Sequence, residues 1–225
     1  LGNPYFGNLA ADLAGEFSRH SYNMIICDTA GKTMDLNRSL TTAGTVLVSV
    51  GNRDFMDRIS KIRPVVGICC AVKDRSGIPN VGIDFSEAYT QIFEKAVYSD
   101  KDRIAFCSSV LREFPNLAED KFIHVYTAMK NKGLSPVGNR IFSEMGSLLS
   151  YINASPGSIN CVIYENDLMA AELQSKLVKR GFKVPEDIVV VGCDGTMVLE
   201  GMWSIRIDTK AIAAKAVEFF IEYCA

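Results

Sequence analysis

The chain has 225 residues, of which 48% are apolar and 22% are charged. This length suffices for one large domain or two small ones, and the composition is ordinary for a soluble globular protein. Lys and Arg number 24 against 26 Asp and Glu, a formal net charge of −2. No concentrated basic face for nucleic acid is expected, and no apolar stretch is long enough to span a bilayer.

The seven cysteines are an odd number at irregular spacing, mostly inside or beside apolar runs. This usage is typical of small reduced hydrophobes in a cytoplasm rather than of a disulfide framework. No Cys-x-x-Cys pair occurs, and the two histidines, His20 and His124, are far apart. We therefore expect neither a zinc site nor a cofactor.

The first half of the chain alternates predicted helices with predicted strands. An opening helix has Asn3 as its cap and Pro4 in its first turn. Strands are predicted over 22–27, 46–50 and 64–69, a short extended piece over 78–84, and helices over 32–42, 54–62 and 86–98. The alternation predicts an α/β fold.

The second half continues the same alternation. A strand is predicted over 103–107, helices over 118–132 and 140–152, a strand over 202–208, and a closing helix over 209–223. Between them, residues 159–195 form a strand–helix–strand unit. Its second strand, 188–192, is apolar throughout, as in a parallel sheet covered on both faces. In such sheets ligands bind beyond the carboxyl ends of the strands, here Glu165–Asp167 and Cys193–Gly195.

This unit also carries a family resemblance. Residues 166–170 (Asn-Asp-Leu-Met-Ala), Gly181, 184–187 (Val-Pro-Glu-Asp) and 190–195 (Val-Val-Gly-Cys-Asp-Gly) resemble the effector-binding domain of LacI/GalR-type transcription regulators. Two further runs share the resemblance, namely Asn-Pro-Tyr-Phe at 3–6 and Arg-Ile-Ala-Phe at 103–106. In the family a strand precedes the first of these, so we expect a trimmed chain.

The resemblance implies a periplasmic-binding-protein-like fold, with two doubly wound parallel-sheet subdomains and a ligand cleft between them. We place one subdomain at 1–100 plus 205–225 and the other at 101–204. The implied partners are a small-molecule effector, sugar-like or another small metabolite, and a twin subunit in a homodimer. Operator DNA would be bound only through a helix-turn-helix domain absent from this chain, and the location would be cytoplasmic, without membrane contact. The alternative is an extracytoplasmic solute-binding protein of a transport system.

The resemblance also implies effector contacts. The candidate ligand-binding residues are Asn3, Tyr5, Phe6, Ser49, Cys69, Phe122, Asn166 and Asp194. Several have a structural alternative: Tyr5 and Phe6 can stack on a ligand or fill the core, and Asp194 can accept from ligand hydroxyls or brace a turn. Asn166 can equally cap a helix.

The chain departs from sugar-binding relatives at two of these positions. Cys69-Cys70 stands where they often carry Asp-Arg, and Phe122 where they often carry an Arg near a helix start. Phe122 can also be ordinary core. These replacements predict fewer bidentate hydrogen bonds to a ligand. Phosphate loops, dinucleotide glycine motifs and nucleophile elbows are all missing from the sequence, so we expect a binding protein rather than an enzyme.

Overall fold

The computed structural model describes residues 3–27, 42–71, 77–96, 103–109, 115–133, 140–197 and 199–224, without the side chains of 115–120 and 224. Contacts divide the chain into a first unit, Leu1–Ile83 with Asp208–Ala225, and a second unit, Asp84–Ile207. The divisions therefore fall after residues 83 and 207, whereas the sequence boundaries lie after 100 and 204. Residues 84–96 and the last residues of the 202–206 strand lie with the second unit.

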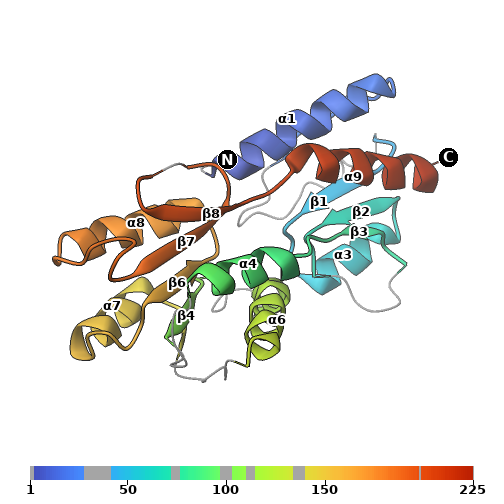
Figure 1. Cartoon of the computed structure of the whole chain (residues 1–225). Helices are drawn as coiled ribbons and strands as arrows, with labels where there is room; N and C mark the ends of the chain where they lie inside the picture. Colours follow the sequence, from blue (N-terminus) through green and yellow to red (C-terminus); the bar gives the residue numbers. More distant parts are fainter. Residues whose placement is uncertain are drawn as a thin grey trace. The chain divides into compact units, whose positions relative to one another are not determined.

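The first unit contains a parallel three-stranded sheet of order β1-β2-β3 (Figure 1). Its strands are β1 (Thr45–Val48), β2 (Val65–Ile68) and β3 (Asn80–Val81), and its helices are α1 (Pro4–Arg19), α3 (Arg53–Ser60) and α9 (Thr209–Cys224). The wholly buried β2 is central, as its uninterrupted apolar run predicts. Met56 and Ile59 of α3 pack with Leu47 and Val65 in one core cluster.

Helices α1 and α9 pack against each other through aromatic side chains. The rings of Phe17 and Phe220 meet edge to face with centroids 5.0 Å apart, and Tyr22 adds a third ring 5.7 Å from Phe220. Thr209 Oγ1 also donates to Asp12 Oδ2 over 2.6 Å. Burial of these large rings stabilises the pairing by several kcal/mol, at about 1.5–3 kcal/mol per side chain.

The second unit contains a parallel five-stranded sheet of order β5-β4-β6-β7-β8 (Figure 1). The strands are β4 (Ile104–Cys107), β5 (Ile141–Phe142), β6 (Cys161–Tyr164), β7 (Val189–Asp194) and β8 (Met202–Arg206). The helices are α4 (Ser86–Ala96), α6 (Pro115–Asn131), α7 (Met145–Ala154) and α8 (Asp167–Val178). The predicted α/β class with parallel sheets is confirmed.

Helices cover both faces of this second sheet. Ala105, Cys107 and Val162 share a core cluster with residues of α7 and α8. Phe106, between the first two, turns to the other face, where its ring lies 6.3 Å from that of Phe122 on α6. This two-residue alternation, with both faces apolar, is the doubly wound arrangement.

Two predicted elements are wrong. Residues 22–27 form no strand: they pair with none of the described strands, and Ile25 and Ile26 are 71% and 56% exposed. Residues 140–144 are not the start of a helix, because Ile141 and Phe142 pair with β4 and the helix begins at Met145. The predicted helix at 32–42 lies outside the described residues.

Candidate functional site

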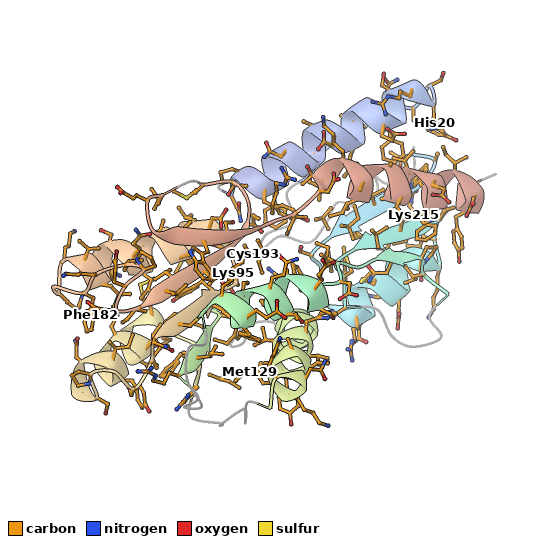
Figure 2. The ribbon with its side chains drawn as sticks, in the orientation of Figure 1. His20, Lys95, Met129, Phe182, Cys193 and Lys215 are labelled. Carbon is orange, nitrogen blue, oxygen red and sulfur yellow. The ribbon has the colours of Figure 1, made fainter. Side chains whose placement is uncertain are left out.

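The carboxyl ends of β4, β6 and β7 gather five polar side chains in the second unit. We call Ser108, Ser109, Lys121, Glu165 and Cys193 the strand-end cluster. Ser108 and Ser109 follow β4, and Glu165 follows β6. Cys193 is the penultimate residue of β7 (Figure 2), and Lys121 lies on α6. Because parallel strands end at one sheet edge, residues distant in sequence meet here.

Glu165 is the centre of the strand-end cluster. It is nine-tenths buried, with 8% of its surface exposed. The Ser109 hydroxyl donates to Glu165 Oε1 over 2.7 Å, and the Ser108 hydroxyl donates to Oε2. A buried carboxylate must be hydrogen-bonded to remain stable, and these hydroxyls supply part of that requirement.

Lys121 contributes a cation to the same edge. Its ammonium donates to the main-chain oxygen of Glu165 over 2.7 Å and lies 3.6 Å from Cys193 Sγ. It also lies 5.3 Å from the centroid of the Phe85 ring, a cation–π distance. Burial raises the pKa of Cys193 to about 11, a shift that nearby Lys121 opposes, so this thiol stays protonated near neutral pH.

Asp194, the last residue of β7, is buried to 8% exposure and has φ of +110°. Ser49 and Cys69, which follow β1 and β2 in the first unit, have φ of +53° and +49°. Non-glycine residues rarely adopt such angles, and those that do concentrate at functional sites. Three predicted ligand-binding residues therefore share one unusual backbone feature at strand carboxyl ends.

Asn166 caps α8, with Oδ1 accepting from Met169 N over 2.9 Å. This is the structural alternative foreseen for it, and its carboxyl-end position also keeps it near Glu165. Gly192 lies where β7 passes α8, and a Cβ there would lie 2.3 Å from Asp167 Oδ1. The glycine is needed because no side chain fits in that space.

The structure places Phe122 in ring contacts, 6.3 Å from Phe106 and 6.1 Å from Tyr126. The preceding residue, Lys121, is the one that reaches the strand ends. Successive helical residues differ in direction by about 100°, so a shift of one position decides which side chain faces the sheet edge. Sequence reasoning missed Lys121, and its only signal was its position next to the candidate residue Phe122.

The first unit carries the other predicted residues. Asn3 caps α1 by accepting from Tyr5 N over 2.9 Å. Tyr5 is buried to 6% exposure, and the half-buried Phe6 ring lies edge-on to it at 5.2 Å. Cys69 is half-buried, and the buried Cys70 donates to the Leu47 carbonyl over 3.2 Å. All of these residues belong to the first unit.

Comparison with known proteins identifies the relatives. No family model matches the chain. The ribose operon repressor of Escherichia coli is 26% identical over 219 residues, covering 85% of this chain and 62% of the repressor. Catabolite control protein A of Priestia megaterium is 22% identical over 242 residues, covering 99% of this chain and 72% of that protein. The chain thus spans less than two thirds of the repressor's length.

Solved structures give the same answer for the fold. The transcription regulator CcpA of Lactococcus lactis superposes with a TM-score of 0.81 at 18% identity, covering 99% of this chain and 87% of that chain. A LacI family regulator from Lactobacillus casei with bound sucrose gives 0.78 at 18% identity, covering 99% and 88%. The chain is related to the LacI family of transcription regulators. These relatives are regulators rather than enzymes or transport proteins, as expected from the sequence.

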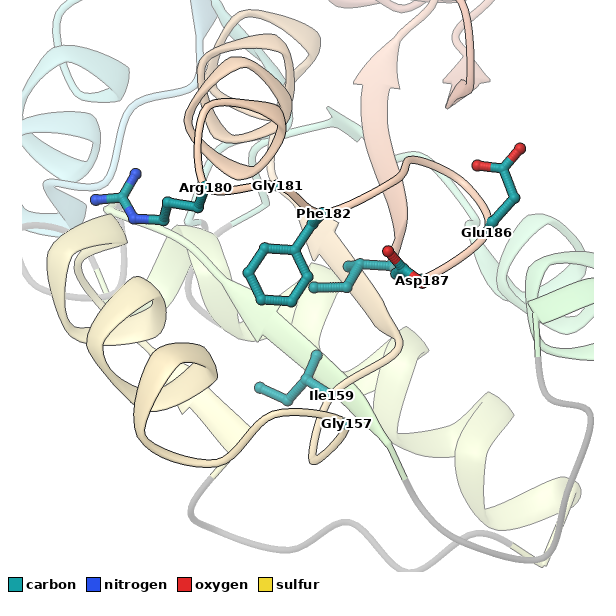
Figure 3. A pocket seen from close by; sticks show the side chains of 8 residues that line it. Gly157, Ile159, Arg180, Gly181, Phe182, Glu186 and Asp187 are labelled. Atoms are coloured by element: carbon teal, nitrogen blue, oxygen red, sulfur yellow. The ribbon is translucent and has the colours of Figure 1, made fainter.

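A second feature of this LacI-like fold lies at the opposite edge of the second sheet. A shallow hollow of about 490 Å³ opens where the chain enters β6 and β7, lined by Ile159, Phe182, Ile188 and neighbouring residues (Figure 3). Arg180 donates to the Lys176 carbonyl and Asp187 accepts from Lys183 N, so both serve local backbone. The hollow contains none of the predicted ligand-binding residues.

Neither a metal-ligand cluster nor a membrane-spanning helix is found in the described ranges. Among those residues, no three His, Cys, Asp or Glu side chains gather closely enough to hold a metal ion. No helix in the described part of the chain has the length and apolar character needed to cross a membrane.

Proposed function

We propose that residues 1–225 form the effector-binding region of a LacI-type transcription regulator, with a small hydroxylated molecule as effector. The observation that carries this proposal is the strand-end cluster together with Asp194. Carboxylates from the ends of β6 and β7 and an ammonium from α6 lie at the edge where open α/β sheets bind ligands.

The chemistry of this edge suits a polyhydroxy ligand. A hydroxyl both donates and accepts, so it can donate to Asp194 or Glu165 and accept from Lys121. The related proteins support this class, because one regulator structure contains sucrose and another, CelR, contains cellobiose. Asn166 at the same edge, and Asn3, Tyr5, Phe6, Ser49 and Cys69 in the first unit, remain proposed effector contacts; Phe122 is the weakest, given its ring contacts.

The proposal extends to partners. We expect a homodimer in the cytoplasm, with operator DNA bound through a helix-turn-helix domain outside residues 1–225. The segment itself should bind duplex DNA negligibly at physiological salt, because its net charge is −2 and counterion release needs a concentrated positive face.

Thermal unfolding in the presence of glucose, sucrose, cellobiose and ribose tests the proposed function. At least one sugar should raise the unfolding temperature in a concentration-dependent manner, because a ligand that binds only the folded state stabilises it. The increase should be much smaller in Asp194→Asn, which keeps the side-chain shape and removes the charge. If none of the four sugars raises the unfolding temperature and the chain instead binds duplex DNA at micromolar concentration, the proposal fails.

A further inference from the structure

Asp167 is a wholly buried carboxylate at the start of α8, with no exposed surface. Its Oδ2 accepts from Thr196 N over 2.6 Å, from Met197 N over 3.1 Å and from Thr196 Oγ1 over 3.3 Å. Its Oδ1 accepts from the Ser204 hydroxyl over 2.5 Å. Two backbone amides and two hydroxyls therefore satisfy one buried charge, as burial of a carboxylate requires.

The donors all lie around the turn that follows Asp194. Ser204, on neighbouring β8, accepts from Gly195 N over 3.1 Å while its own hydroxyl donates to Asp167. The three successive amides of residues 195–197 are thus tied to Asp167, one through Ser204 and two directly. A single side chain on α8 fixes the path of the chain as it leaves β7.

The backbone conformation of Asp194 depends on the path of residues 195–197. Its φ of +110° is costly for a residue with a Cβ and persists only when the surroundings determine it. Gly195 follows with φ of +67°, and a Cβ there would lie 2.9 Å from Arg206 Cα, so only glycine fits at this position of the turn. The hydrogen bonds from Asp167 and Ser204 to the 195–197 turn oppose the backbone cost at Asp194.

We infer that Asp167 is a positioning residue: it holds the 195–197 turn and thereby aims the Asp194 carboxylate at the effector, without touching the effector itself. The inference rests on the proposed function for its consequence in binding. The positioning itself is a property of the turn, and it can be measured without any ligand.

The test substitutes Asp167→Asn, which keeps the shape and replaces one acceptor oxygen by a donor. The matched control is Asp187→Asn, which removes an acceptor of one backbone amide (Lys183 N, 2.8 Å) at the other edge of the sheet. A second control, Leu173→Ala, lowers stability from the buried face of the same helix. Amide hydrogen exchange without ligand should accelerate about tenfold or more at Thr196 and Met197 in Asp167→Asn alone, beyond any change shared with Leu173→Ala.

Titration with the sugar that stabilises the parent completes the test. Asp167→Asn should weaken binding about tenfold, and this loss should shrink to less than about twofold when Asp194→Asn is already present, because coupled residues are not additive. The inference is overturned if Asp167→Asn leaves the amide exchange rates at residues 196–197 unchanged. It is also overturned if Asp167→Asn weakens binding equally in the parent and in the Asp194→Asn variant. If no sugar binds the parent, the proposed function fails, and the exchange result alone decides whether Asp167 holds the turn.

Discussion

The ammonium of Lys121 lies 2.7 Å from the main-chain oxygen of Glu165 and 3.6 Å from Cys193 Sγ. One cation on α6 therefore spans the ends of two neighbouring strands, β6 and β7. This position puts an ammonium donor next to the buried Glu165 at the carboxyl end of the sheet.

Lys121→Met should weaken effector binding by about 1–3 kcal/mol, because it removes a charged donor and keeps the apolar stem. Calorimetric titration with the stabilising sugar provides the measurement. Lys132→Met is the control, since Lys132 makes an exposed 2.6 Å ion pair with Glu94 and should leave the affinity unchanged. Equal affinities for Lys121→Met and the parent would remove Lys121 from the site.

Gly192→Ala should lower the free energy of unfolding by about 1–3 kcal/mol, since the new methyl group would overlap Asp167 Oδ1. Urea denaturation monitors the change. Gly146→Ala in α7 is the matched control: nothing lies within 4 Å of its added Cβ, and the replacement should stabilise by about 0.4–1 kcal/mol. Destabilisation of the same size in both variants would contradict the packing of β7 on α8.

Stability should fall at alkaline pH because of buried thiols. Burial raises the pKa of Cys161 to about 12 and the pKa values of Cys107 and Cys193 to about 11. A pKa raised in the folded state confers stability that is fully present below the unfolded value of 9.0 and is lost as pH rises to between 11 and 12. Urea midpoints should therefore fall between pH 9 and pH 11. The fall should be smaller in Cys161→Ala, and an identical profile for the variant would contradict the assignment.

Thiol reactivity should separate the cysteines by exposure. Cys27 is exposed and Cys69 half-buried, whereas Cys70, Cys107, Cys161 and Cys193 are buried. A thiol reagent should modify Cys27 rapidly in the folded protein and all seven cysteines after denaturation. Cys27→Ser should remove the most rapid phase. Recovery of a single thiol from denatured protein would indicate disulfides and favour an extracytoplasmic protein.

The oligomeric state should be a twofold dimer. Regulators that read paired half-sites require such symmetry, and a lasting interface buries more than about 1,000 Å². Sedimentation equilibrium should give a mass near twice the 24.7 kDa of one chain. A species of 24.7 kDa that persists at tens of micromolar would count against this part of the proposal.

Much of the fold could be predicted from the sequence because its strands are apolar on both faces. The runs at 161–164 and 188–192 match β6 and much of β7, and polar residues lie where these strands end. The run at 22–27 is also largely apolar yet forms no strand, because it pairs with none of the described strands. Ile141 and Phe142 continue the apolar spacing of the next helix, and only their pairing with β4 shows that they are a strand.

The site could be predicted only in part. Asp194 was accessible from sequence because it lies at the end of a long apolar run. The strand-end cluster was not, because its five members come from four elements between residues 108 and 193 and meet only in the folded sheet. The contacts of Asp167 with the 195–197 turn were hidden for a similar reason: its position in the sequence indicates a helix start, and its partner Ser204 on β8 lies 37 residues away.

Amide chemical-shift mapping of the labelled protein with its stabilising sugar tests whether the strand-end cluster and Asp194 bind the effector. The largest shifts in the second unit should fall on Ser108, Ser109, Asn166 and residues 193–197, at the carboxyl edge of the sheet. Shifts confined to Ile159 and residues 180–188 would place the ligand in the hollow at the opposite edge and contradict the account.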